Sequence, residues 1–230
     1  MKKYLSYFVL FLFCFSVSFA YSEDINLSGC LKDANGSYSK QYDCYYKVKE
    51  YYQNENKRIL QELQTELPAA SYLKVTKNQK IFSDYLKSLN NGEIQILNQT
   101  LGFMYQTFAQ EILLSANKTN YQILNVLKNN IYNNNKPNIP SNINLSTKLN
   151  FYYNETEKNF SDKQFRLVAQ SQSTWKEYQN DTINQILPML KISKESKINI
   201  QKHLLKDRID TLFSLNSIIY EVEGFPTFSP

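Results

Sequence analysis

The sequence predicts an all-α protein made of antiparallel helical hairpins that pack into a bundle, and three observations support this fold class. Apolar residues recur at three- and four-residue spacing over long segments, which is the period of one helix face. The 230-residue chain has only five glycines, whereas the tight turns of an all-β fold would use more. One helical pattern of Val, Gln and two aromatic residues also occurs twice.

The first copy of this motif is Val75-x-x-x-Gln79-x-x-Phe82-x-x-Tyr85, and the second, ninety-three residues later, is Val168-x-x-x-Gln172-x-x-Trp175-x-x-Tyr178. Helical spacing places the Val, the Gln and the first aromatic ring on one stripe. A buried Gln without partners costs about 1–3 kcal/mol, so its recurrence predicts a fixed polar contact between packed helices. We interpret the motif residues as core positions, with contact to a ligand or partner as the alternative: Gln79, Phe82, Tyr85, Gln172, Trp175 and Tyr178.

The two copies predict a duplicated helix pair. Upstream of the motif, Tyr51-Tyr52-x-x-x-x-Lys57 is similar to Tyr152-Tyr153-x-x-x-x-Lys158, so the similarity extends over a second helix. Chance similarity in a chain rich in Tyr and Asn is the alternative explanation.

The N-terminus has the pattern of a secretory signal peptide, which we assign to residues 1–20. Lys2 and Lys3 precede an apolar run from Tyr4 to Phe19, and small residues occupy the positions that a signal peptidase reads. The run is shorter than the roughly 20 residues of a membrane span, so we expect no stable span after cleavage. The mature chain would be periplasmic or secreted.

Cys30 and Cys44 remain after signal cleavage, and an oxidising compartment favours a disulfide between them. Closing a loop of about 15 residues contributes roughly 3 kcal/mol in the chain-entropy model. We expect this bond to hold the N-terminal segment against the first long helix.

The remaining chain divides into two helical repeats, a linker and a tail. In the first repeat, residues 21–132, we expect helices over 42–67 and 70–89, a helix exit at Asn90-Asn91-Gly92, and a third helix from Glu93 to Ile131 with a break at 117–120. Residues 133–145 contain two prolines and few apolar residues, which is typical of a linker. In the second repeat, residues 146–222, we expect helices over 146–160 and 162–187, capped by Ser146 and Ser161, and a last helix over 194–219. Residues 223–230 form the tail.

The composition predicts no nucleic-acid binding, no cofactor and no metal site. The whole chain has 26 Lys and Arg against 21 Asp and Glu, and loss of Lys2 and Lys3 with the signal peptide leaves a net charge of +3 without a basic cluster. His203 is the only histidine, and the sequence has neither a zinc signature nor a phosphate-binding glycine loop. We therefore expect a protein without enzymatic activity. A hydrolase whose two carboxylates converge from distant positions is compatible with the sequence.

Three short segments resemble one bacterial family. Cys30 and Cys44 match its leading Cys pair, Gln172, Trp175 and Tyr178 match its Gln-x-x-Trp-x-x-aromatic motif, and Leu204-x-x-x-Arg208-x-x-x-Leu212 looks like its closing helix. On these residues the chain resembles the LprI-type lysozyme-inhibitor domain family, here in two divergent copies. The chain departs from the family where Gln179-Asn180-Asp181-Thr182 stands in place of a basic residue and a further cysteine. The resemblance implies an exported all-helical protein of a bacterial envelope, in a family where lysozyme inhibition is claimed for some members.

The resulting hypothesis is an exported binding protein with a protein partner, for which lysozyme is the first candidate. A net charge of +3 provides no long-range attraction to basic animal lysozymes, so inhibition would depend on local contacts. One alternative is a structural or secreted host-interaction protein, associated with virulence, without lysozyme activity. A second alternative is a cell-wall glycan hydrolase. The oligomeric state does not follow from the sequence.

Overall fold

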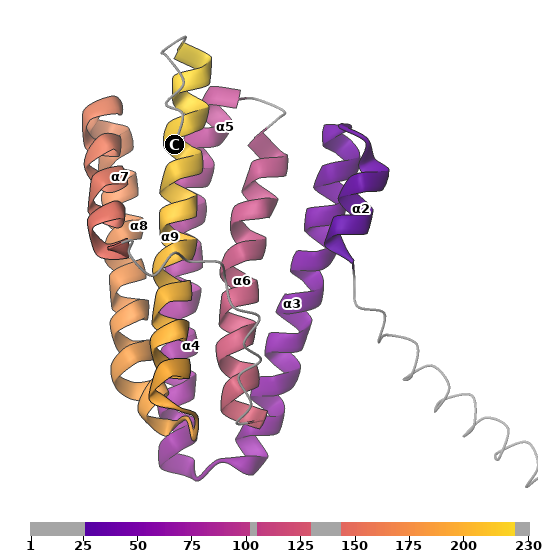
Figure 1. Cartoon of the computed structure of the whole chain (residues 1–230), viewed down its shortest axis with the longest axis vertical. Coiled ribbons are helices and arrows are strands. Elements are labelled where there is room, and N and C mark those ends of the chain that lie inside the picture. Colours follow the sequence, from indigo (N-terminus) through magenta and orange to yellow (C-terminus); the bar gives the residue numbers. More distant parts are fainter. Residues whose placement is uncertain (1–25, 102–104, 130–143, 224–230) are drawn as a thin grey trace, which may run out of the picture.

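The computed structural model describes residues 26–101, 105–129 and 144–223, and every regular element in these ranges is a helix. Figure 1 shows the long helices side by side in an elongated bundle. The α-helices are α2 (Leu27–Ala34), α3 (Tyr38–Glu66), α4 (Ala69–Leu89), α5 (Gln95–Leu101), α6 (Tyr105–Asn129), α7 (Leu145–Asn159), α8 (Asp162–Asp181) and α9 (Lys194–Glu223). Two π-helical turns, η1 (Asn90–Ile94) and η3 (Thr182–Ile186), follow α4 and α8, and a 3-10 turn, η4 (Leu187–Met189), precedes α9. The predicted all-α class is confirmed.

Proline separates the first two long helices. Leu67 has extended backbone and Pro68, whose ring cannot continue a helix, stands between α3 and α4. The predicted helices over 42–67 and 70–89 therefore agree with the structure, except that α3 already begins at Tyr38.

The predicted helix exit at Asn90-Asn91-Gly92 is wrong, because the chain continues through η1 directly into α5. Gly92 is buried against α8, and a Cβ at this position would lie 2.9 Å from the carbonyl oxygen of Leu167. Glycine here permits the close approach of two backbones and does not end a helix.

The break predicted at 117–120 is also wrong, since α6 runs without interruption from Tyr105 to Asn129. The asparagines that suggested a turn are buried and hydrogen-bonded. Asn117 Nδ2 donates to the carbonyl oxygen of Leu113 at 2.7 Å, and Asn120 pairs with Gln79 of α4. Partners in the fold thus remove the reason for these residues to favour a turn.

The two predicted helix caps of the second repeat have different outcomes. Ser161 caps α8 through a capping box: its Oγ accepts from the Gln164 amide at 3.4 Å, and Gln164 Oε1 accepts from the Ser161 amide at 3.1 Å. Ser146 does not cap α7, because the side chain of Asn144 accepts from the Thr147 amide at 3.2 Å instead. The last helix, α9, continues to Glu223, past its predicted end.

Three helix pairs build the bundle: α3 packs on α6, α4 on α8, and α7 on α9. In Figure 1, α3 and α6 occupy one side of the bundle and α7 and α8 the other. A single cluster of buried apolar side chains extends through these pairs. Because α4 and α8 carry the two copies of the motif, the two copies lie at the contact between these helices.

Some predictions lie outside the described residues: the signal peptide 1–20, the linker up to residue 143, and the tail from residue 224. Within the ranges that the structure describes, none of the helices combines the length and the apolar character that a membrane crossing requires.

Cys30 of α2 and Cys44 of α3 are joined by a disulfide, with a Cα–Cα distance of 5.8 Å. Asn35 and Gly36, with φ values of 45° and 78°, turn the chain between the two helices. The main apolar cluster contains no residue of α2, which packs on α3. The disulfide therefore attaches a peripheral helix to the bundle.

Replacing Cys30 and Cys44 by Ser together should release α2 and leave the bundle folded. We expect trypsin cleavage at Lys32 to become at least about tenfold faster, because local opening of α2 no longer breaks a covalent link. The thermal midpoint should fall by less than about 5 °C. A fall of about 10 °C or more would mean that α2 unfolds together with the bundle, and the reduced wild-type protein serves as the matched comparison.

Candidate functional site

The aromatic residues of the two motif copies lie between α4 and α8 in the interior. Phe82, Tyr85, Trp175 and Tyr178 are at most 6 % exposed. The ring centroids of Phe82 and Tyr178 are 5.0 Å apart, and the Tyr85 and Tyr178 rings are nearly parallel at 6.3 Å. The rings of Phe82, Tyr85 and Tyr178 pack against each other, and all four residues present almost no surface to a partner.

The glutamine of the first copy takes part in a polar contact with α6. Gln79 Nε2 donates to Asn120 Oδ1 at 3.0 Å, and Asn120 Nδ2 donates back to Gln79 Oε1 at 2.9 Å. The hydroxyl of Tyr178 donates to the same Asn120 Oδ1 at 3.0 Å. One residue of α6 thus receives the Gln of the first copy and the Tyr of the second.

The glutamine of the second copy contacts α9 in a similar arrangement. Arg208 Nε donates to Gln172 Oε1 at 2.7 Å, and Arg208 also interacts with the side chain of Tyr85. One residue of α9 thus receives the Gln of the second copy and the Tyr of the first. A duplicated helix pair would produce this exchange of contacts, and the duplication itself stays a prediction.

Arg208 also forms an ion pair inside the bundle. Its Nη2 lies 2.6 Å from Glu93 Oε1, and both side chains are 0 % exposed. Ser171 links the two charges, since its hydroxyl donates to Glu93 and accepts from Arg208 Nη2 at 3.1 Å. Burial lowers the pKa of Arg208, but the charge of Glu93 and the hydrogen bonds outweigh burial, so the pKa lies above its usual value. Arg208 is therefore a fixed positive charge.

Sequence reasoning quoted Arg208 in the closing-helix motif but missed its partner Glu93. The sequence could have indicated such a partner, because Arg208 lies between Leu204 and Leu212 on one apolar helix stripe. An arginine on a buried face requires an acidic partner. Glu93 gave no comparable signal, since the sequence indicated only that a helix begins near it.

The buried ion pair has a structural role and is not a binding site. Glu93 Oε2 and Arg208 Nη1 have no hydrogen-bond partner in the described part of the chain, yet both residues are fully covered by neighbouring side chains. A ligand would have no access to them. Among the described residues, His, Cys, Asp and Glu side chains also form no group of three that could hold a metal ion.

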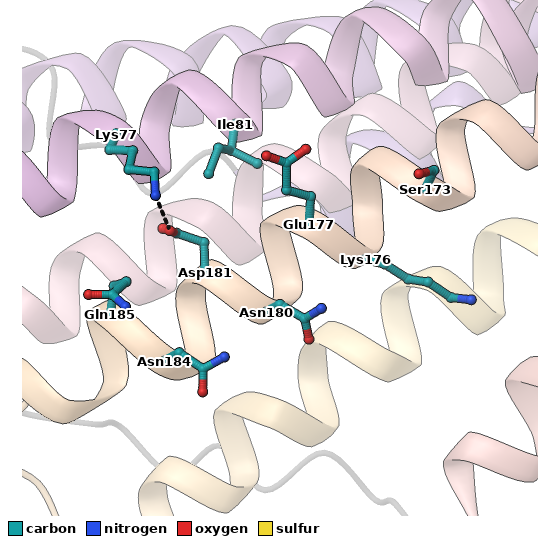
Figure 2. Close-up of a pocket in the computed structure, with 9 residues that line it drawn as sticks. All are labelled: Lys77, Ile81, Ser173, Lys176, Glu177, Asn180, Asp181, Asn184 and Gln185. Carbon is teal, nitrogen blue, oxygen red and sulfur yellow. Dashed lines mark ion pairs between the residues drawn. The ribbon is translucent and has the colours of Figure 1, made fainter.

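A groove on the outer side of the α4–α8 pair is the candidate binding site (Figure 2). It is open to solvent and encloses about 450 Å³. Lys77 and Ile81 come from α4, and the other lining residues come from α8 and η3: Ser173, Lys176, Glu177, Asn180, Asp181, Asn184 and Gln185. No sequence prediction assigned a site to these residues, because outward-facing polar side chains show no distinctive periodicity.

Asp181 is the fixed polar group of this groove. Its side chain is only 8 % exposed, accepts a hydrogen bond from Asn78 Nδ2 at 3.0 Å, and lies 3.6 Å from Lys77 Nζ. Figure 2 shows the Lys77 ammonium group directed at the Asp181 carboxylate. Asn78 also donates to Thr182 Oγ1 at 3.0 Å, which ties α4 to the start of η3.

Six polar side chains of the groove make no hydrogen bond or ion pair with the described part of the chain: Ser173, Lys176, Glu177, Asn180, Asn184 and Gln185. Their donors and acceptors are available to a bound molecule. The lining holds two Lys, one Glu and one Asp, so positive and negative charges balance.

Replacing Arg208 by Met should lower the free energy of unfolding by about 3–5 kcal/mol, because Glu93 would stay buried without a positive partner. Urea unfolding measures this loss. Lys206→Met is the matched control on α9, since the ion pair that it removes, with Asp210, lies at the surface and should cost less than about 1 kcal/mol. Equal losses in the two variants would show that the buried ion pair contributes no more to the free energy of unfolding than the exposed one.

Replacing Gly92 by Ala should destabilise the protein by about 1–3 kcal/mol, although Ala favours a helix by about 1 kcal/mol over Gly. The added methyl group would meet the Leu167 carbonyl oxygen and push α8 away from η1. Thermal unfolding beside the exposed Asn91→Ala variant measures the effect. A gain in stability for Gly92→Ala would mean that the two backbones separate without cost.

No protein-family model matches the sequence, and no curated protein is detectably similar to it. The structure is similar to the crystal structure of an uncharacterised protein from Burkholderia thailandensis. The TM-score is 0.62 at 16 % sequence identity, and the match covers 86 % of this chain and 98 % of that chain. The two proteins therefore share the fold of the helical bundle.

Proposed function

We propose that this protein is an exported, non-enzymatic binding protein that engages a protein partner through the groove between α4 and α8, with lysozyme as the first specific candidate. The observation that supports this proposal is that polar side chains on the inner side of the α4–α8 pair have partners, whereas most of those on the outer side have none among the described residues. On the inner side, the motif residues contact one another and their helical neighbours. On the outer side, six polar side chains have no partner in the described part of the chain. Binding uses the outer groups and leaves the inner ones as a rigid support.

The chemistry of the groove favours a protein segment over other ligands. The amides of Asn180, Asn184 and Gln185 offer both donors and acceptors, which match the backbone of a peptide. The lining has no aromatic ring that could stack on a sugar. Its balanced charges attract neither strongly acidic nor strongly basic ligands, so binding should depend weakly on salt.

Lysozyme is the first candidate because of the family resemblance. Two of the segments that carry the resemblance meet in the structure, since Gln172 of one motif accepts a hydrogen bond from Arg208 of the other. The leading Cys pair is bonded as well. These contacts bring together the residues on which the resemblance rests. The groove supplies a local polar surface, which inhibition would need because a net charge of +3 gives no long-range attraction to a basic lysozyme.

Two other functions compete with this proposal. A glycan hydrolase is favoured by one observation, the presence of the carboxylates Glu177 and Asp181 in the same groove. Hydrolysis needs two carboxyl groups that flank the glycosidic bond, whereas these two come from successive turns of one helix and Asp181 is engaged by Asn78 and Lys77. A host-interaction protein without lysozyme activity would use the same groove for a different partner.

The test is a titration of lysozyme activity on cell-wall substrate with the purified, disulfide-bonded protein. We expect inhibition that increases with dose. Asn180→Arg places a long charged side chain in the groove and should weaken inhibition at least about tenfold, which corresponds to 1.4 kcal/mol. Asn54→Arg, at an exposed position of α3 outside the groove, should inhibit like the wild-type protein.

The remaining outcomes decide between the alternatives. Absence of inhibition would reject lysozyme as the partner, and equal loss in the two Arg variants would reject the groove as the contact surface. Lysis of the substrate by the protein alone, abolished by Glu177→Gln, would identify a hydrolase.

A further inference from the structure

Asp207 of α9 is a partly buried carboxylate at the contact with α6, and it forms no ion pair with any described residue. Its Oδ1 accepts a hydrogen bond from Ser115 Oγ at 3.2 Å, and its Oδ2 accepts one from Thr119 Oγ1. Both hydroxyl groups belong to α6 and stand one turn apart. No ion pair between described residues includes Asp207, because its neighbour Lys206 pairs with Asp210 instead.

A small cavity lies beside this carboxylate. About 10 Å³ of it is open to the centre of a water molecule, which is the room that one water needs. The wall combines polar groups of Asp207, Ser115, Thr119 and Thr211 with rings and apolar side chains of α4, α6, α8 and α9. Asp207 keeps a small exposed surface, so protons and water can reach it.

The ionisable groups around Asp207 do not neutralise it. Tyr85 of α4 and Tyr178 of α8 face the same cavity, and burial raises the pKa of both above the usual value, so they stay uncharged. On α9, Arg208 is engaged by Glu93, while Asp210 and Lys206 act on Asp207 in opposite directions. Burial and two lysines, Lys206 and Lys118, lower the pKa of His203, which is therefore neutral near pH 7.

Among the described residues, no charged group of the other elements that pack on α9 acts on the pKa of Asp207. The ionisable groups of α7 that act on α9 are Tyr152, which is coupled to Asp210, and Tyr153, which is coupled to Arg208. The sequence of α5 contains no ionisable side chain. Solvent, or a proton, must therefore balance the charge of Asp207.

We propose that Asp207, Ser115 and Thr119 form a proton-binding site that couples the contact between α6 and α9 to the pH of the surrounding solution. The protonated carboxyl donates to one hydroxyl group and accepts from the other, so it joins the two helices without a buried charge. Loss of the proton leaves a carboxylate that draws water into the cavity and loosens the contact between α6 and α9.

The direction of the effect follows from the pKa. Burial raises the pKa of Asp207 to about 7, against the opposing hydrogen bonds from Thr119 and Ser115, while an ordinary Asp has a pKa of 3.8. The folded state thus binds more protons than the unfolded state between these two pH values. Through this group, stability falls as the pH rises from about 4 to about 7 and is constant above. The lowered pKa of His203 acts in the opposite direction below its usual pKa, so a comparison with a variant of Asp207 is required.

The experiment measures thermal unfolding of the wild-type protein and of Asp207→Asn from pH 5 to pH 8. Asn keeps the hydrogen bonds to Ser115 and Thr119 without a charge. We expect the thermal midpoint of Asp207→Asn, relative to that of the wild type, to rise by about 5 °C between pH 5 and pH 8, since the contribution of His203 cancels between the two proteins. Asp210→Asn, one turn away at an exposed position, should keep most of the wild-type dependence on pH, because burial and not the charge of Asp210 is the largest cause of the raised pKa of Asp207.

Three results would overturn the proposal. The first is a constant difference between wild type and Asp207→Asn at all pH values. The second is a gain in stability with NaCl but not with choline chloride at pH 8, which would identify a cation in place of the proton. The third, which applies even if Asp207→Asn does not fold, is a carboxyl ¹³C titration of Asp207 in the wild-type protein with a midpoint near the ordinary value of 3.8.

Discussion

The buried ion pair between Arg208 and Glu93 holds three segments of the bundle in place, because a charge in the interior needs a partner of opposite charge. Arg208 comes from α9, Glu93 from η1, and Ser171 and Gln172 from α8 complete the contact. Because both charged side chains are 0 % exposed, none of the three segments can shift without leaving a charge unsatisfied in the interior. The π-helical turn brings Glu93 inward, and Gly92 beside it allows η1 to approach α8 closely.

The polar contacts define how the helices pair, which apolar packing alone leaves open. Leu and Ile side chains can pack in several registers, whereas the reciprocal amide pair of Gln79 and Asn120 forms in only one. The inner faces of α4 and α8 are thus committed to the scaffold, and the outer faces of the same two helices form the groove. This division lets the surface vary for binding while the interior holds its geometry.

Several local signals in the sequence were correct because no distant residue intervenes. Pro68 separates two helices, Ser161 with Gln164 forms a capping box, and the cysteine pair is bonded, because each depends on neighbours in the chain. The Ser146 cap is wrong for a local reason, because Asn144 caps α7 instead. The failures at 90–92 and 117–120 have a different cause. Gly92 and the asparagines near 117–120 resemble turn signals, but contacts with α8 and α4 keep both segments helical. Of the candidate site, sequence reasoning identified Gln172 and Arg208 without their contact, and it identified neither Glu93 nor the groove.

The sequence by itself determined the all-α class, the main helices, and the recurrence of a polar residue within an apolar stripe, since helical periodicity and capping are encoded within a few residues. Only the tertiary structure decided which polar groups meet. Glu93 pairs with Arg208, Asn120 with Gln79, and Asp207 is left to two hydroxyl groups, because these choices depend on which helices become neighbours. The free energy of a buried polar group is set by the partner across the helix contact, and no local pattern in the chain specifies that partner.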